Sequence, residues 1–499
     1  MRTPDKVGLL SVVALLAGCA TSSLDLAPPA PNVPWTPTTR ADGEIVAGAP
    51  ASRSAPRSDS YVLPSNPRAA GQAPASLGVD ESHAYTLAEL IDLAESHNPL
   101  TRVAWENARD AALATGIAKA TYLPDLTASV VGAYQVSRNE SLRGSISDVS
   151  VQWLLFDFGE RAAVVSAAEQ ASVIANIGFT AAHQQLIYRV ALAYYIHMAA
   201  RARLGTAARA LRNAEAVQAA AEARRAHGVG TVVDVAQARQ GTAQAELAQV
   251  DAIGQAQDTR LALLAAMGIS PLTPIRIADL GQRKLSPALI GPIDQIVTEA
   301  LARRTDVLSA YAAREASLAG LQAAEADFMP KVFLSSTGSY ASNTANISSL
   351  PGFGQLPPTL NLAGSHFGAT VLLGITVPIY DGGVRRAREG EARADEAKAE
   401  ATLQEVRDEA TREIVGAANG VRTSLAALDA AAALASAAQI TFDATLDAYR
   451  KGVGSITDAT RAETALLEAQ NASTDAYSAA LSSAATLALA AGTLGTPPQ

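Results

Sequence analysis

Residues 366–383 read HFGATVLLGITVPIYDGG, and this stretch decides the fold class because its apolar residues alternate along most of its length. Every odd-numbered position from Phe367 to Ile379 is apolar, whereas most even-numbered positions are small or polar. A period of two indicates a β-strand with one apolar face. About a dozen residues suit a strand that crosses a bilayer, whereas soluble sheets usually have strands of about five or six residues. We therefore expect one face toward lipid and the other toward water.

Three further stretches alternate in the same way. Residues 124–139 and 147–156 do so on either side of a polar connection at 140–146, so 124–156 is expected to be a hairpin. The opening stretch is expected to end a second hairpin, 330–380. The residues expected on the lipid-facing side are Phe367, Val371, Leu373, Ile375, Val377, Val149, Val151 and Trp153.

Most of the remaining chain has helical periodicity. A capping box at Thr86 and Glu89 begins an alanine-rich helix that runs toward Ala120. Residues 159 to about 226 contain no proline, so a nearly continuous helix of roughly 100 Å is expected there. Helices of this length are stabilised by lateral packing on other helices. No uninterrupted run of about 18 apolar residues follows the N-terminal signal, so no helical membrane span is expected.

The chain repeats itself. Pro124 recurs as Pro330, an offset of 330 − 124 = 206, and Gly228 recurs as Gly452, an offset of 452 − 228 = 224. The offset changes within the second hairpin, where residues 345–365 replace a short loop. The expected organisation is a signal peptide (1–18), a Pro-rich tether (19–83), a first repeat (84–268), a crossover segment (269–292), a second repeat (293–492) and a tail (493–499).

The composition excludes several classes of function. A formal net charge of −9, with basic and acidic residues interspersed, argues against nucleic acid as a partner. The six histidines show no ligand spacing, and no nucleophile triad, phosphate loop or zinc motif is present. We therefore expect neither an enzyme nor a metal or other cofactor.

The single cysteine, Cys19, ends a segment with the charged, apolar and small-residue regions of an export signal. The ending Leu16-Ala17-Gly18-Cys19 resembles a bacterial lipoprotein signal, which would leave Cys19 as the acylated first residue. The alternative is an ordinary signal that is cut elsewhere, with Cys19 discarded.

Four strands cannot close a membrane barrel within one chain. A barrel in lipid needs at least about eight strands, because open edges leave backbone groups without hydrogen-bond partners. The chain is therefore expected to oligomerise, or else its strands do not lie in a membrane. The second possibility corresponds to a coiled-coil spacer lipoprotein without a pore.

In this duplicated order the chain resembles the TolC-like outer-membrane efflux family. The features that carry the resemblance are the ending at Cys19, the strand entries Leu123-Pro124 and Met329-Pro330, the strand exits 155–159 and 379–383, and the Gly-rich breaks 227–231 and 451–455. The family usually has Arg-Pro-Asp-Leu where this chain has Arg304-Thr305-Asp306-Val307. The departure lies at a helix start, so we expect no effect on function.

The resemblance implies a mainly α fold with a transmembrane β-barrel contribution. Three chains would form a homotrimer with one barrel, continued by a long α-helical coiled-coil barrel through the periplasm. The implied function is a passive outer-membrane duct that exports small molecules delivered by an inner-membrane pump through a periplasmic adaptor. A proton-driven drug pump is favoured, and a channel for type I protein secretion is the alternative.

The candidate access-control residues lie at the helix ends farthest from the hairpins. Gly228, Gly230, Gly452 and Gly454 form the expected tip turns, with Thr231 and Ser455 as helix caps. Threefold symmetry would bring Asp234 and Asp458 near the axis, and family members carry acidic rings at this aperture. Arg461 stands where a second acid would strengthen such a ring. Both acids also have the spacing of helix-capping residues, so a purely structural role remains open.

Overall fold

The computed structural model describes residues 26–28, 37–42, 44–46, 63, 65–66, 79–136, 141–279, 281, 291–342 and 367–495. The chain divides into two compact units, Met1–Asp80 and Glu81–Gln499. In the first unit Thr39 and Ile45 form an isolated antiparallel bridge, beside an ion pair between Arg40 and Glu44. The predicted anchor Cys19 and the insertion at 345–365 lie outside the described residues. The helices and strands below all belong to the second unit.

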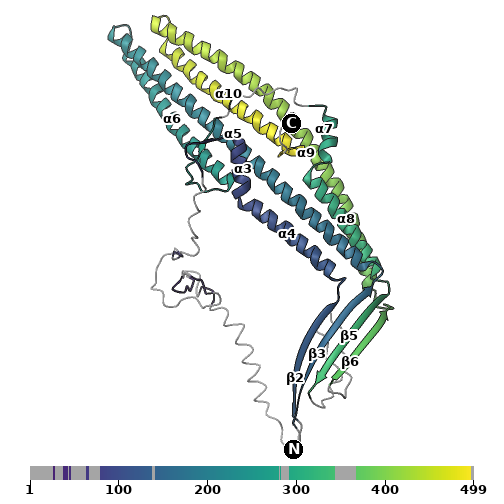
Figure 1. The fold of residues 1–499 in the computed structure, drawn as a ribbon. Coiled ribbons are helices and arrows are strands. Elements are labelled where there is room, and N and C mark those ends of the chain that lie inside the picture. Colours follow the sequence, from purple (N-terminus) through teal and green to yellow (C-terminus); the bar gives the residue numbers. More distant parts are fainter. Residues whose placement is uncertain are drawn as a thin grey trace, which may run out of the picture. The chain divides into compact units, whose positions relative to one another are not determined.

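The second unit consists of two similar series of elements (Figure 1). The first series is α3 (Leu87–His97), α4 (Pro99–Ala120), β2 (Asp125–Val136), β3 (Ser141–Phe156), α5 (Glu160–Ala226) and α6 (Val232–Met267). The second series is α7 (Ile293–Leu301), α8 (Thr305–Ala326), β5 (Lys331–Ala341), β6 (Phe367–Thr376), α9 (Val384–Lys451) and α10 (Ile456–Ala490).

The two hairpins have the same register under the offsets that the sequence predicts. Asp125 lies opposite Gln152 in the first hairpin, and Lys331 lies opposite Thr376 in the second. The differences are 331 − 125 = 206 and 376 − 152 = 224, the two offsets of the sequence repeat. The internal duplication is therefore confirmed at the level of individual residue pairs.

The four strands form one antiparallel sheet in the order β2-β3-β5-β6. β3 and β5 join the two hairpins along a ladder from Ile146 and Ala341 to Phe156 and Val332. β2 and β6 are thus the edges, and within the described residues each of them pairs on one side only. Both edges have free backbone groups that can pair with another strand.

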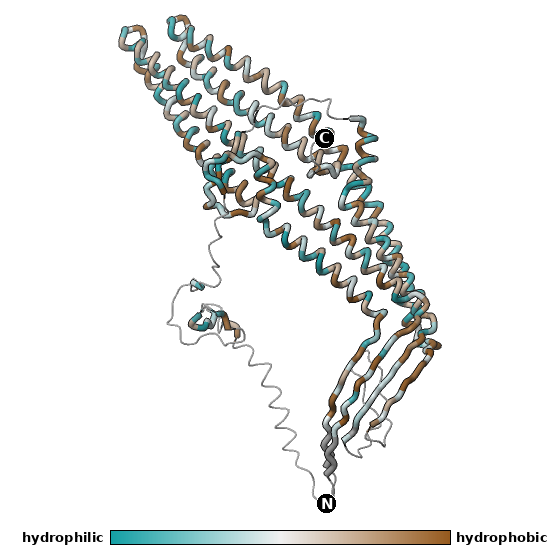
Figure 2. Tube along the Cα trace, in the orientation of Figure 1, coloured by the Kyte–Doolittle hydropathy of each residue, from teal (hydrophilic) through white to brown (hydrophobic). Residues whose placement is uncertain are grey.

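Long helices extend from the sheet, and α5 and α9 are 67 and 68 residues long (Figure 1). α5 packs on α4, α6, α8 and α10, and α9 packs on α8 and α10. Their contact faces are rich in alanine, such as the buried Ala210, Ala214 and Ala221 of α5. Small side chains let the helix axes approach closely, so the long helices are held by one another rather than by a thick core. Brown and teal residues accordingly alternate along these helices in Figure 2.

Several boundaries differ from the sequence prediction. The first helix is divided into α3 and α4, because Asn98 caps α4 by accepting from the Leu100 amide and Pro99 occupies the first helical position. β3 begins at Ser141, so part of the predicted connection 140–146 is strand. β6 ends at Thr376, which leaves Val377 outside the strand.

Two features were not expected from the sequence. The strands β1 (Ala84–Tyr85) and β4 (Arg276–Ile277) pair in parallel, and they tie the start of the first repeat to the crossover segment. α5 and α9 each contain an 18-residue window with a mean hydropathy of 1.3 and 1.5, respectively, so by length and composition alone each could cross a membrane. Alanine raises these averages without forming an uninterrupted run of large apolar residues, which is why the sequence reading missed them.

Candidate functional site

The sheet has one apolar face, and the register shows which residues lie on it. Residues directly opposite one another in a sheet share a face. Trp153 lies opposite Leu334, which lies opposite Leu373, and the same holds along the neighbouring rows. Seven of the eight predicted lipid-facing residues therefore lie on one face: Phe367, Val371, Leu373, Ile375, Val149, Val151 and Trp153. Most of them are exposed, as expected for a surface that needs another apolar medium.

The opposite face of the sheet carries polar and small residues. Thr127 and Ser150 hydroxyls lie 2.7 Å apart across β2 and β3, and Ser129 donates to the carboxylate of Asp148. At the position of the second hairpin that corresponds to Thr127 and Ser150, Phe333 lies over Gly374. A Cβ at Gly374 would approach Phe333 Cζ to 2.4 Å, so glycine is needed for the ring to lie there.

Each long helix begins at a joint built from an Asp, a Gly and an Arg. In the first repeat Asp157 Oδ2 accepts from the backbone N–H of Arg161 at 2.9 Å and from Arg161 Nε at 2.8 Å. Gly159 between them has φ +101°, a conformation that favours glycine. Burial acts to raise the pKa of Asp157, but the hydrogen bonds from Arg161 outweigh it and the pKa is lowered.

The second joint repeats this arrangement with Asp381, Gly383 and Arg385. Asp381 Oδ2 accepts from the Arg385 backbone N–H at 3.0 Å and from its Nη1 at 3.1 Å, and Gly383 has φ +90°. The backbone hydrogen bond from Arg385 is the main cause that lowers the pKa of Asp381. Both stretches were identified from the sequence as strand exits, but the pairing of Asp with Arg within them was not predicted. The signal was available, since an Asp lies four residues before an Arg at the same place in both repeats.

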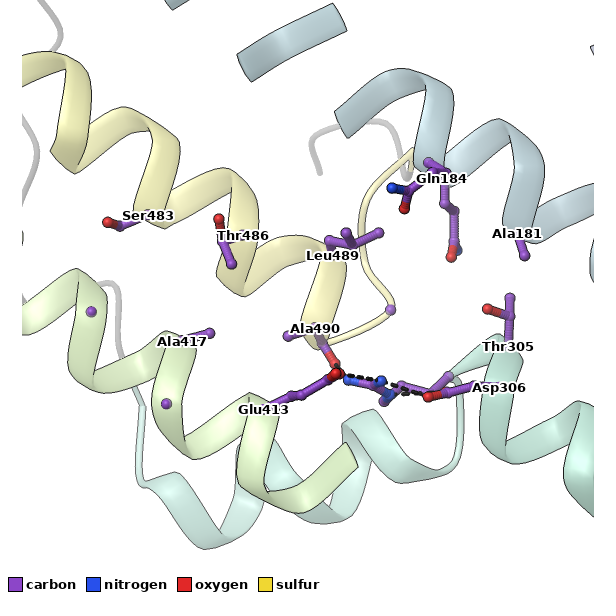
Figure 3. Close-up of a pocket in the computed structure, with 15 residues that line it drawn as sticks. Ala181, Gln184, Thr305, Asp306, Glu413, Ala417, Ser483, Thr486, Leu489 and Ala490 are labelled. Atoms are coloured by element: carbon purple, nitrogen blue, oxygen red, sulfur yellow. Dashed lines mark hydrogen bonds and ion pairs between the residues drawn. The ribbon is translucent and has the colours of Figure 1, made fainter. Parts of the chain in front are cut away.

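A cluster of polar contacts around the buried Arg304 joins the start of α8 to the end of α10 and to α9 (Figure 3). Its Nη1 donates to the Ala490 carbonyl oxygen at 3.2 Å, and its Nη2 donates to Asp306 and Glu413 at 2.6 Å each. The hydrogen bonds that Arg304 donates to the Asp306 carboxylate are the main cause that raises the pKa of Arg304. The cluster borders a cavity of about 670 Å³ between α5, α8, α9 and α10. Residues 304–307, where the sequence departs from the usual family pattern, therefore lie at a junction of four helices.

Asn98 is the counterpart of Arg304 in the first repeat, 304 − 98 = 206 positions earlier. Its Nδ2 donates to the carbonyl oxygen of Ala266 at 3.2 Å, and Ala266 precedes Ala490 by 490 − 266 = 224 positions. In both repeats, then, the N-cap residue of one helix (α4 or α8) donates a hydrogen bond to a carbonyl oxygen at the C-terminal end of another (α6 or α10). The donor is a neutral amide in the first repeat and a charged guanidinium in the second.

The predicted tip turns lie between α5 and α6 and between α9 and α10. Gly228 and Gly452 have φ +76° and +82°. A Cβ at Gly230 would approach the Arg225 backbone nitrogen to 2.8 Å, and at Gly454 it would approach the Tyr449 backbone nitrogen to 3.1 Å. Positive φ and close backbone approach explain why each turn has two glycines.

The two predicted aperture acids lie in the first turns of α6 and α10. Asp234 accepts from the Thr231 backbone N–H at 2.9 Å while Thr231 caps the Asp234 N–H, a full capping box. Ser455 Oγ accepts from the Asp458 N–H at 3.1 Å and lies 2.7 Å from its carboxylate. Arg461 lies 3.9 Å from Asp458, and both side chains are exposed. The capping geometry is present in both repeats, and Asp458 is left facing solvent.

Arg224 and Tyr449 join the two tips, a contact that was not predicted from the sequence. Arg224 Nη1 donates to the Tyr449 carbonyl oxygen at 2.8 Å, and its guanidinium lies over the Tyr449 ring. Tyr449 packs in an apolar cluster formed by all four long helices, with members such as Val217, Val235 and Ile456. No spacing rule relates residues this far apart in sequence.

Other titratable groups lie along the helices. His197 is buried, and its Nδ1 lies 3.1 Å from Thr259 Oγ1. Burial is the main cause that lowers the pKa of His197 to about 4. Burial raises the pKa of Glu463 in α10 to about 7. Within the described residues no group of three or more His, Cys, Asp or Glu side chains could hold a metal ion.

Comparison with known proteins shows what kind of protein has this duplicated architecture. The sequence profile of the outer membrane efflux protein family matches residues 90–269 and 296–493, one segment in each repeat. The chain belongs to this family. It is an outer-membrane channel component of an efflux or secretion system, and its fold is that of channel proteins.

Curated relatives agree with this assignment. The chain is 29% identical over 416 residues to Protein CyaE of Bordetella pertussis, covering 82% of this chain and 84% of the relative. It is 29% identical over 332 residues to the outer membrane protein OprJ of Pseudomonas aeruginosa, covering 64% and 66%. It is 30% identical over 213 residues to the pyoverdine export outer membrane protein OpmQ of Pseudomonas putida, covering 42% and 40%.

Solved structures have the same fold. The outer membrane protein VceC of Vibrio cholerae superposes with a TM-score of 0.69 at 22% identity, covering 81% of this chain and 96% of that one. The open state of the MtrE outer membrane channel of Neisseria gonorrhoeae gives 0.65 at 22% identity, covering 81% and 88%.

Proposed function

We propose that three copies of this chain form one channel, with a barrel built from the four-stranded sheets and a tunnel built from the long helices. The observation that carries this proposal is a sheet with one apolar face and two edge strands, each of which pairs on one side only among the residues that the structure describes. Open edges are not tolerated in hydrocarbon, and four strands are too few to close a barrel. Three copies supply twelve strands and leave no edge. A spacer without a pore has no use for four strands of 10 to 16 residues.

In this proposal the channel is a passive duct without catalytic activity. A periplasmic adaptor and an inner-membrane pump, which we expect to be proton-driven, deliver small molecules to the helical tips. The name of one relative, the pyoverdine export outer membrane protein OpmQ, supports a small-molecule cargo. The exposed Asp458 lies at the tip, where an acidic ring would favour cations and hinder anions.

Purified protein in planar bilayers tests the channel directly. We expect stepwise single-channel conductance, together with a particle mass of three chains by light scattering in detergent. A monomeric particle, or a bilayer without conductance steps, would contradict the proposal. Expression in a strain that lacks its own outer-membrane efflux channel tests the cargo. Restored dye efflux supports small molecules, and restored protein secretion without dye efflux would overturn this choice.

We also propose that Cys19 is the lipid-bearing first residue of the mature chain, which would hold the N-terminus at the outer membrane. Mass spectrometry of the mature N-terminal peptide should find Cys19 acylated. An unmodified N-terminus at any other residue would refute the anchor without affecting the channel.

A further inference from the structure

The cavity beside Arg304 has two glycines in its wall that helix packing does not explain. Gly416 and Gly420 lie one turn apart in the interior of α9, and both line the cavity. Among the described residues no neighbouring group lies within 4 Å of the place where a Cβ at either position would be. A glycine inside a helix destabilises that helix relative to alanine. The two glycines therefore keep a space open at the expense of helix stability.

The duplicated architecture does not require this space. The counterparts of Gly416 and Gly420, 224 positions earlier in α5, are Leu192 and Ile196. The corresponding helix of the first repeat thus carries large apolar side chains at the same two positions. The glycine pair is a feature of the second repeat, and it needs an explanation that the shared fold does not supply.

The cavity also carries more negative than positive charge. Its charged lining residues are one base, Arg304, and two acids, Asp306 and Glu413. The Arg304 guanidinium already donates to both carboxylates and to the Ala490 carbonyl oxygen. The carboxylates keep capacity for a further partner, since the Asp306 and Glu413 side chains are 44% and 49% exposed. A cation is therefore favoured in this cavity and an anion is not.

The charge pattern, like the glycine pair, distinguishes the two repeats. In the first repeat Asn98 stands in the place of Arg304 and Leu100 in the place of Asp306. Arg189 stands in the place of Glu413, so the sign of the charge is reversed there. The open space and the acidic excess thus occur together in the second repeat.

The rest of the wall suits an organic cation. Ala181 of α5, Ala417 of α9 and Leu489 of α10 provide apolar surface. Gln184 of α5 and Ser483 of α10 add uncharged polar groups (Figure 3). The volume of about 670 Å³ lies within the range of small-molecule sites, which are mostly apolar with a few polar groups.

We propose that this cavity binds a small organic ammonium ion with an apolar body. The ammonium group pairs with the Glu413 carboxylate, and the apolar body lies against Ala181 and Leu489 in the space that Gly416 and Gly420 leave open. The ligand thereby joins α5 to α9 where α8 begins and α10 ends (Figure 3). All of these residues belong to one chain, so the site does not depend on the proposed trimer.

Two probes of similar shape test the site on the purified full-length protein. Phenethylammonium is charged at neutral pH, whereas phenethyl alcohol is neutral. Equilibrium dialysis in detergent should give an affinity about fivefold higher for the ammonium ion, because a charge-assisted hydrogen bond is stronger than a neutral one. Equal affinities for the two probes, or no binding of phenethylammonium, would overturn the proposal.

Filling the cavity tests where the probe binds. A variant with Gly416→Leu and Gly420→Ile introduces the residues of the first repeat, favours the helix, and should lose the binding of phenethylammonium. The matched control is Gly390→Ala, roughly 40 Å along the same helix, where a Cβ also meets nothing within 4 Å among the described residues. This control should bind as the parent does, and all three proteins share the same uptake of probe by detergent. If the filled variant binds as well as the parent, the probe lies elsewhere and the proposal is wrong.

Glu413→Gln separates charge from shape. The affinity for phenethylammonium should fall about fivefold while that for phenethyl alcohol stays the same, since only the ammonium ion pairs with the carboxylate. An equal loss for both probes would contradict the role assigned to Glu413. Hydrogen exchange locates the site independently, because amides 181–185 and 413–420 should exchange more slowly when phenethylammonium is added. Slower exchange confined to other segments would refute this cavity as the site.

Discussion

The guanidinium of Arg224 lies 5.0 Å from the centroid of the Tyr449 ring, and its Nη1 donates to the Tyr449 carbonyl oxygen at 2.8 Å. Arg224 lies in the last turn of α5 and Tyr449 in the last turn of α9, so one side chain holds the two tips together. Burial is the main cause that raises the pKa of Tyr449, and Asp234 contributes to it. The contact therefore lies beside the turns that the sequence singled out.

Replacing Arg224 should loosen this contact. Arg224→Ala removes a charge-assisted hydrogen bond and a cation–π contact, together about 2–3 kcal/mol. Hydrogen exchange of amides 446–454 should accelerate accordingly. The control is Arg225→Ala, because among the described residues the exposed Arg225 side chain makes no hydrogen bond or ion pair. Equal exchange in the two variants would show that Arg224 does not hold the tips.

The role of Asp458 can be separated into charge and capping. Asp458→Asn removes the exposed charge and keeps the Ser455 cap, so it should reduce cation block of single channels. Ser455→Ala removes the cap, costs about 1 kcal/mol of helix stability, and should leave cation block unchanged. If Asp458→Asn leaves cation block unchanged, Asp458 is a capping residue only.

The two faces of β6 should respond differently to a charge. Leu373 lies on the apolar face and its neighbour Leu372 on the polar face. Leu373→Arg would place a charge on the lipid-facing side, at a cost of up to about 4 kcal/mol, and should block outer-membrane assembly. Leu372→Arg should assemble and alter conductance instead. Membrane fractionation followed by bilayer recording distinguishes them, and the opposite result would reverse the assigned faces.

Loss of Arg304 should destabilise the second repeat more than loss of Asn98 destabilises the first. Arg304→Ala leaves Glu413 and Asp306 without their cation, at a cost of about 2–3 kcal/mol, because both carboxylates are nearly half exposed and water screens them. Asn98→Ala removes a neutral hydrogen bond and a helix cap, about 1–2 kcal/mol. Denaturation midpoints of the purified variants measure both. Similar losses would show that the charge at Arg304 adds nothing.

Glu463 should make the helical region less stable as pH rises. Its pKa is raised by burial from 4.5 to about 7, so its contribution to stability is fully present below pH 4.5 and lost as pH rises through 7. Glu463→Gln should therefore stabilise the protein at pH 8 by about 1–2 kcal/mol and change little at pH 4, since partial exposure weakens the effect. The exposed Glu468 of the same helix, replaced by Gln, is the control. An equal gain at both pH values would contradict burial as the cause.

The sequence by itself determined the repeat, the long helices, the four strands and the apolar side of the sheet. These follow from periodicities of 3.6 and 2.0 and from glycine and proline positions, which act over a few residues. The tertiary structure decided where β6 ends, and that Arg224 meets Tyr449 and Arg304 meets Glu413. Those outcomes depend on which helices and strands become neighbours. No local pattern records a contact across 225 residues, because it forms only once the two repeats have packed together.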